Sequence, residues 1–369
     1  MSTALKDLYS PAFIDQFLPS AQRVIPEFDP NAFRKSVFNK EWPAMELKAR
    51  MRHLAVCLHS FMPKNFSKAS KLLIALVDEL TASRMTGYGL EFMFIPDYVA
   101  LYGLDDLAAA NKAMERITQF SSCEFAVRPF ILKYPAEMAQ QMLKWSLHKD
   151  EKVRRFASEG IRPRLPWAMA IPALKKDPSP VLPILENLKN DPSAFVRKSV
   201  ANNLNDISKD HPDVLLNIAR KWKGNSANTD AIIKHASRTL LKSAHPGVLR
   251  YYGLHKNDAI NVESFSIAAA RVKWGGDLSF QFSVINTGKK TADVRLEYSL
   301  YFLRKNGQLS KKVFKISERK LAANEKITLI RKHSFRAITT RVYYPGQHEV
   351  AVVVNGKEFH KGSFLLLSK

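Results

Sequence analysis

The sequence predicts a mainly α-helical, HEAT-like repeat solenoid followed by an all-β immunoglobulin-like sandwich. Apolar residues recur at three- and four-residue spacing up to residue 255, and one helical segment has an echo 43 residues further along. A two-residue period takes over from residue 258. We therefore expect two domains, residues 1–255 and residues 258–369, which suit a chain of 369 residues.

The first domain has the pattern of amphipathic helices joined by short turns. Apolar side chains fall on one helical face in segments 45–62 and 66–84 and in several segments that follow. HKDEKVRRFASEGIRPRL (148–165) is echoed by KNDPSAFVRKSVANNLND (189–206). Such repeats of two helices each are typical of HEAT-like arrays, which stack into one continuous concave binding surface. An irregular helical bundle with chance echoes is the alternative.

The second domain alternates apolar and polar residues and is rich in Phe, Val and Ile. Turn sequences such as KNGQ and VNGKE separate seven such runs, a pattern typical of an immunoglobulin-like sandwich. The predicted strands are 264–272, 277–286, 293–303, 312–321, 326–334, 348–356 and 362–367. Neither Cys57 nor Cys123 lies in this domain, so no disulfide is expected to join its strands.

Net charge is the most informative feature of the composition. Lys and Arg number 57 against 34 Asp and Glu, a net charge of +23, which points to a polyanionic partner such as nucleic acid. No run of 18 apolar residues predicts a membrane span, and the N-terminus lacks the apolar core of a signal peptide. We therefore expect a cytoplasmic protein with reduced cysteines. Motifs for zinc, for nucleotide phosphates or for a nucleophilic Ser or Cys are absent, so no metal or cofactor is expected.

Glu124 is the first candidate functional residue. On a predicted helix over 120–131 it lies at the edge of the apolar face, four residues before Arg128, and Pro129 then bends or ends that helix. A carboxylate beside a packed face destabilises the fold unless it is paired. The simpler interpretation is an exposed ion pair within one helix.

Two further polar groups follow in the repeats. Arg154, Arg155, Glu159 and Arg162 form a second polar stripe, which Trp167 follows. The segment ANNLND (201–206) ends in Asp206 and crowds amides that disfavour the middle of a helix unless they have partners. In the simpler interpretations Trp167 belongs to the core and the segment caps a helix. Together, on a repeat surface of a strongly basic protein, these residues favour a concave nucleic-acid site.

The segments SSCEFAVRPFI, VRRFASEGIRPRLPWA and DPSAFVRKSVANNLNDISKDHP resemble the AlkC branch of bacterial DNA alkylation-repair glycosylases. The resemblance spans most of residues 1–255, and a trailing sandwich is attached in one part of that branch. It implies a glycosylase that removes the N3-methylated bases 3-methyladenine and 3-methylcytosine from duplex DNA without flipping them into a pocket. The partner would then be DNA with alkylated bases, bound by a monomer at the bacterial nucleoid.

The resemblance also implies the catalytic residues. Glu124 matches the AlkC-type carboxylate, with Trp167 and Asp206 beside it in the pattern. The Trp-x-x-x-Asp of the sister AlkD branch is absent from the helical part, so its aspartate has no counterpart. A carboxylate about 4 Å from a sugar that becomes cationic offers up to about 4 kcal/mol, or about a thousandfold in rate. This is enough for a labile cationic base and too little for a normal one.

Basic side chains would hold the phosphates beside the lesion without reading its sequence. The predicted DNA-binding residues are Arg128, Arg154, Arg155, Arg162, Arg197, Lys198, Lys234, Arg238, Lys289 and Lys290. We expect a monofunctional enzyme, because no lysine is set apart as a lyase nucleophile. The alternative is a non-catalytic HEAT-repeat scaffold for nucleic acid, and a more distant one is a sandwich that binds another protein.

Overall fold

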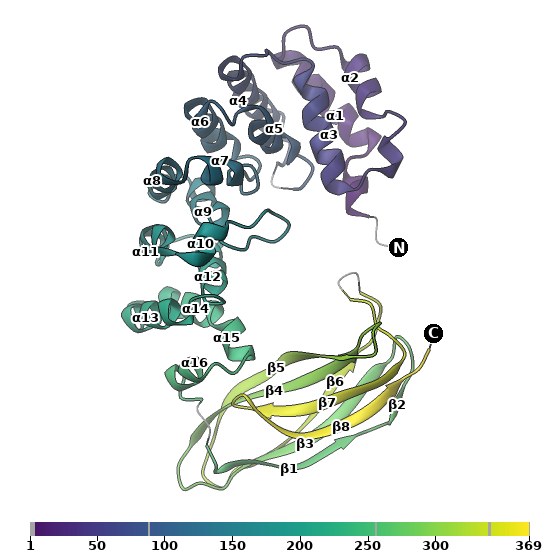
Figure 1. Ribbon diagram of the computed structural model, residues 1–369, viewed down its shortest axis with the longest axis vertical. Helices are drawn as coiled ribbons and strands as arrows, with labels where there is room; N and C mark the ends of the chain where they lie inside the picture. The colour runs from purple at the N-terminus through teal and green to yellow at the C-terminus, as the bar shows by residue number, and fades with distance from the viewer. Residues whose placement is uncertain (1–3, 88, 255–256, 339–340, 369) are drawn as a thin grey trace. The chain divides into compact units, whose positions relative to one another are not determined.

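The computed structural model describes residues 4–87, 89–254, 257–338 and 341–368. The chain forms two compact units: residues 1–211 with 219–236, and residues 212–218 with 237–369. Helices make up the first unit, and the second contains part of one helix, two short helices and a β-sandwich (Figure 1). The fold class is therefore as predicted, a helical array followed by an immunoglobulin-like sandwich.

The described residues form sixteen α-helices, and many begin at side-chain caps or prolines. Ser10, Asn65, Asp106 and Asp150 each accept a hydrogen bond from a backbone N–H in the first turn. The helices are α1 Pro11–Val24, α2 Pro30–Val37, α3 Leu47–His59, α4 Phe66–Ala82, α5 Phe94–Tyr102, α6 Leu107–Ile117, α7 Arg128–Lys133, α8 Pro135–Trp145, α9 Glu151–Gly160, α10 Pro172–Lys176, α11 Leu182–Leu188, α12 Ala194–Ile207, α13 Pro212–Trp222, α14 Ala227–Ala236, α15 Arg238–Lys242 and α16 Pro246–Tyr251.

The echo in the sequence corresponds to helices that lie side by side. Helix α9 packs against α12, and α12 packs against α14 (Figure 1). Their shared core is apolar, with Phe156 and Val200 completely buried. At the centre of the α9–α12 contact, Ser158 Oγ donates to Ser199 Oγ at 2.6 Å. Polar side chains on neighbouring helices are thus held at hydrogen-bonding distance.

The predicted helix over 120–131 is wrong. Helix α6 ends at Ile117, residues 118–127 form what we call the Glu124 turn, and α7 begins at Arg128. Within the turn, Cys123 N donates to Thr118 Oγ1 at 3.3 Å. Pro129 lies in the first turn of α7, where its missing N–H leaves no bond unmade, so it opens a helix rather than ending one.

The sandwich has eight strands in two sheets. The strands are β1 Ile260–Ile267, β2 Arg271–Val272, β3 Asp277–Asn286, β4 Ala292–Leu303, β5 Leu309–Leu321, β6 Lys326–Ser334, β7 Gly346–Val354 and β8 Lys357–Leu366. One sheet has the order β1-β3-β6 and the other β2-β8-β7-β4-β5, so β5 is an edge strand. The first predicted strand, 264–272, is two strands in the structure, β1 and β2, which belong to different sheets. The side chains between the sheets, including Phe282 and Leu300, form a continuous core.

Cys57 and Cys123 are both free and buried. No helix within the described ranges is long and apolar enough to cross a membrane.

Candidate functional site

Six charged side chains of the helical unit form a continuous series, which we call the charge chain. Arg155 Nη1 donates to Glu124 Oε2, and Arg155 Nη2 lies 3.6 Å from Glu159 Oε1. Arg162 donates to Glu159 at 2.5 Å and to Asp206 at 2.8 Å. Lys209 Nζ then donates to Asp206 at 2.9 Å. In order, the charge chain is Glu124, Arg155, Glu159, Arg162, Asp206 and Lys209.

Three stacked elements supply the charge chain. Glu124 comes from the turn before α7, Arg155 and Glu159 from α9, and Asp206 from the last turn of α12. The signs alternate along it, so each buried charge has an opposite charge beside it. Such pairing is the condition under which ionised groups are tolerated away from water. The carboxylates predicted to be catalytic, Glu124 and Asp206, therefore stand near opposite ends of one electrostatic network.

Only one of the two carboxylate oxygens of Glu124 accepts hydrogen bonds from the described residues. Oε2 accepts from Ser122 Oγ at 2.9 Å as well as from Arg155. Oε1 accepts no hydrogen bond from the described residues, and the side chain is 17% exposed. The guanidinium of Arg155 also lies over the ring of Phe195, 4.9 Å from its centroid. The carboxylate is thus fixed on one side and accessible on the other.

Asp206 is almost completely buried within α12. The interpretation that ANNLND caps a helix is wrong, because α12 runs through this segment to Ile207. Two of the amides have partners on neighbouring helices: Asn203 Nδ2 donates to the carbonyl of Ser158 at 2.8 Å, and Asn202 Oδ1 lies 3.2 Å from His235 Nε2. The Asn203 Oδ1 is buried without a hydrogen-bond partner among the described residues.

Arg128 is a structural anchor, which corrects its predicted contact with phosphate. The side chain is completely buried, and burial lowers the pKa of Arg128 to about 10, with a further contribution from Arg162. Nε donates to the carbonyl of Met169 at 2.5 Å, and Nη1 donates to the carbonyls of Gly160 and Arg162 at 2.9 Å each. Arg128 thereby fixes the chain that carries Trp167.

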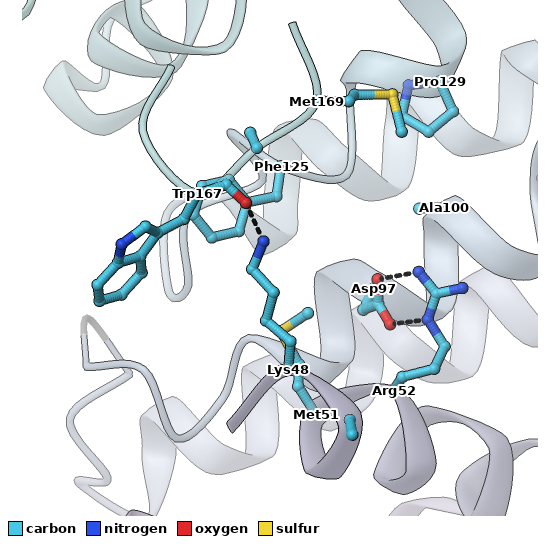
Figure 2. Close-up of a pocket in the computed structure, with 11 residues that line it drawn as sticks. Lys48, Met51, Arg52, Asp97, Ala100, Phe125, Pro129, Trp167 and Met169 are labelled. Atoms are coloured by element: carbon cyan, nitrogen blue, oxygen red, sulfur yellow. Dashed lines mark hydrogen bonds and ion pairs between the residues drawn. The ribbon is translucent and has the colours of Figure 1, made fainter. Parts of the chain in front are cut away.

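Trp167 lies on a loop, residues 163–171, which we call the Trp167 loop. The indole is 57% exposed, so the interpretation as a core residue is wrong. Its backbone has a φ of 65°, a left-handed conformation that costs energy for a residue with a side chain. Lys48 Nζ donates to the carbonyl of Trp167 and lies 5.7 Å from the ring centroid of Phe125 (Figure 2). Lys48 therefore joins the Trp167 loop to the Glu124 turn.

The other predicted DNA-binding residues differ in their exposure to solvent. Arg162 is enclosed by its two carboxylates, which corrects its predicted contact with phosphate. Arg154 forms a bidentate pair with Asp191, at 2.6 and 3.1 Å, and Arg197 donates to the carbonyls of Asp191 and Pro192. Arg155 is paired with Glu124 and Glu159, as described above. The remaining predicted residues are exposed or half-buried, namely Lys198 and Lys234 in the helical unit and Arg238, Lys289 and Lys290 in the other.

Three residues of the site, Lys48, Ser122 and Lys209, were not predicted from the sequence, and Glu159 was predicted without a role. Two of these have a local signal, because Glu159 and Lys209 each lie three residues from their partners Arg162 and Asp206. Lys48 pairs with Trp167, which is 119 positions away, so no local pattern in the sequence marks it. Among the described residues, no cluster of His, Cys, Asp or Glu is arranged to hold a metal ion.

Comparisons with known proteins place the chain in a family. The family model described as "DNA alkylation repair enzyme" matches residues 107–244, which include the whole charge chain, and "Uncharacterised protein YhaZ, C-terminal Ig-like domain" matches residues 261–368. The "Uncharacterized protein YhaZ" of Bacillus subtilis (strain 168) is 44% identical over 356 residues, 96% of each chain. The structure of Pseudomonas fluorescens alkylpurine DNA glycosylase AlkC bound to DNA containing an abasic site analog has 32% identity and a TM-score of 0.92, covering 99% of this chain and 100% of that one. The chain therefore belongs to the AlkC-type DNA alkylation repair enzymes with a C-terminal immunoglobulin-like domain.

Proposed function

We propose that this protein is a monofunctional DNA glycosylase that excises 3-methyladenine and 3-methylcytosine from duplex DNA, without base flipping and without a cofactor. The observation that carries the proposal is the carboxylate of Glu124, which Arg155 holds through one oxygen only, in a turn that Lys48 joins to the loop of the exposed Trp167. Likeness to a DNA-bound AlkC and a net charge of +23 support duplex DNA as the partner. We further propose that it acts as a monomer in the bacterial cytoplasm, on nucleoid DNA.

The chemistry begins from a base that is already a cation. The C1′–N bond breaks, its electron pair stays on the ring nitrogen, and the base leaves neutral. Positive charge then develops on the deoxyribose, where the ionised Glu124 stabilises it by up to about 4 kcal/mol. Water adds to C1′ and gives up a proton, with the open Oε1 of Glu124 as its acceptor. A normal base departs as an anion, and a carboxylate does not stabilise an anionic leaving group.

The charge chain keeps Glu124 ready for this step. Arg155 and Ser122 hold Oε2, so the carboxylate is oriented while Oε1 keeps no partner among the described residues. Asp206 acts in the same network by holding Arg162, which in turn positions Glu159. Trp167 supplies an aromatic face for the cationic base or sugar, worth about 0.5–2 kcal/mol.

Lys198 heads the proposed phosphate contacts in the helical unit. It lines a groove of about 310 Å³ between α12 and α14, together with Arg197, Asn228 and His235. The groove lies beside α12, the helix that carries Asp206, and this position suits a phosphate a few nucleotides from the lesion. Basic turns of the sandwich, including Lys289 and Lys290, provide further contacts in this proposal.

Release of methylated base from alkylated duplex DNA, measured by chromatography, tests the proposal. Wild type should release both bases, and Glu124→Gln should keep its duplex affinity while losing about a thousandfold in rate. A wild type that binds duplex and releases no base would establish the scaffold alternative. Equal loss of binding and release in Glu124→Gln would make Glu124 structural.

A further inference from the structure

A pocket of about 320 Å³ lies between α3, α5, the Glu124 turn and the Trp167 loop (Figure 2). Its size is at the lower end of the range for small-molecule sites, about 300–1,000 Å³, and suits one planar ring system. The walls are mostly apolar and are formed by Met51, Ala100, Phe125, Pro129 and Met169. An aromatic ring and two thioethers are surfaces on which flat heterocycles pack well.

Charged groups on the pocket wall carry an excess of positive charge. Arg52 forms a bidentate pair with the buried Asp97, at 2.6 and 3.0 Å, and its Nη1 has no partner among the described residues. Lys48 gives one N–H to the carbonyl of Trp167 and has three in total. The pocket therefore holds two cations against one carboxylate and offers hydrogen-bond donors. It suits a neutral ligand with an acceptor and disfavours a cation.

Glycosidic bond cleavage produces a ligand with this chemistry. A cationic methylated base becomes neutral when the electron pair of the C1′–N bond stays on its ring nitrogen, and that nitrogen becomes an in-plane acceptor. The intact lesion is a cation and would be repelled by Lys48 and Arg52. Charge thus separates the two states of the same base: the substrate is excluded and the product is accepted.

We propose that this pocket binds the neutral methylated base after its release, with the ring against Phe125 and its new acceptor nitrogen toward Lys48 or Arg52. The inference rests on the proposed function and concerns the fate of its product. The lesion stays in the duplex during cleavage, and the base enters the pocket only once it is uncharged. Capture of the base also opposes its return to the sugar.

Calorimetric titration of the full chain with free 3-methyladenine tests the inference. Wild type should bind it, and filling the pocket with Ala100→Phe or Ala49→Phe should weaken binding about tenfold or more. Ala49 is exposed on α3 and tolerates a larger side chain, so one variant remains if Ala100→Phe fails to fold. The matched control is Ala136→Phe, at an exposed position of α8, which should bind as wild type does.

Two further experiments distinguish a free neutral base from a cationic nucleoside and from a base that is still part of the DNA strand. 1-Methyladenosine, a cationic nucleoside at neutral pH, should bind far more weakly than 3-methyladenine, and equal binding would overturn the assignment. A duplex with 2-aminopurine opposite an abasic-site analogue reports a base everted from the strand. A pocket-filling variant that alters this fluorescence, while free base does not bind wild type, would assign the pocket to the strand instead. Wild type that binds free base and excises none would remove the proposed function and leave the pocket as a base site.

Discussion

Arg162 Nε donates to Asp206 Oδ2 at 2.8 Å, across 44 residues of sequence, and both side chains are nearly excluded from solvent. The pair joins the segment after α9 to the last turn of α12. Its partners on either side, Glu159 and Lys209, extend it into the charge chain. Because a buried charge without a partner is strongly destabilising, the network contributes to the stability of the repeats as well as to the proposed chemistry.

Asp206→Asn should lower the free energy of unfolding by about 1–3 kcal/mol, because Arg162 loses one of its two buried carboxylates and keeps only Glu159. Urea denaturation followed by circular dichroism measures the loss. The control is Asp210→Asn, whose pair with Arg164 lies at the surface and should contribute less than about 1 kcal/mol. Similar losses for the two variants would contradict a buried network.

Glu159→Gln should reduce kcat for base release by about tenfold with little change in duplex affinity. Glu159 touches no proposed reacting atom, and it holds Arg155 and Arg162 in place between the two carboxylates. Single-turnover release and duplex binding by fluorescence anisotropy separate these effects. Glu151→Gln, at an exposed position of the same helix, is the control. Loss of binding in parallel with release would point to general unfolding rather than positioning.

Lys48→Met should loosen the Trp167 loop, because the carbonyl of a residue with strained backbone loses its donor. We expect faster proteolytic cleavage within residues 163–171 and slower base release. Limited proteolysis with mass spectrometry locates the cut sites. Lys64→Met removes the same charge from an exposed position and should leave the pattern unchanged. An unchanged pattern in Lys48→Met would mean that Arg128 alone holds the loop.

The sandwich should lose stability as pH falls from about 6.5 to about 4. Burial lowers the pKa of His333 to about 4, with contributions from Arg341 and Lys312, so His333 stays neutral in the folded state where the unfolded chain binds a proton. The loss should be about 3 kcal/mol from His333. Burial lowers the pKa of His348 too, so both act in the same direction.

His333→Phe, which suits the surrounding rings of Phe302, Phe314 and Phe335, should flatten this dependence without abolishing it. Unfolding by urea at a series of pH values gives the slope. His360→Gln, at an exposed position of β8, should retain the wild-type slope. A wild-type slope in His333→Phe would show that His333 is not the group responsible.

Local pattern was sufficient for several strands and insufficient for the division between β1 and β2 and for the turn at Glu124. The predicted strands 277–286 and 326–334 coincide with β3 and β6, because alternation of apolar and polar residues is a property of neighbouring positions. Residues 120–131 also have helical spacing, yet a short turn is held there by contacts such as Thr118 with Cys123. Spacing alone does not distinguish a helix from a turn whose apolar side chains pack into the same core.

The arginines illustrate a second limit. Arg128 donates to carbonyls 32, 34 and 41 residues away, so its burial depends on how repeats stack and not on its neighbours in sequence. The same holds for Arg162, whose Asp206 partner lies in a later helix. Sequence predicts that these positions carry charge, but whether an arginine meets a phosphate or a carbonyl is decided by tertiary structure.

Strand β5, thirteen residues long, lies at the edge of its sheet with β4 on one side, and helix α15 packs against it. The backbone N–H and C=O groups that an edge strand leaves unpaired in its sheet are a template for a strand of another molecule, and so for aggregation. The strand is densely cationic, with Lys311, Lys312, Lys315, Arg319 and Lys320. Because of these charges, two copies that approach each other edge to edge would repel. The same lysines that suggest attraction to polyanions therefore also oppose aggregation of the sandwich.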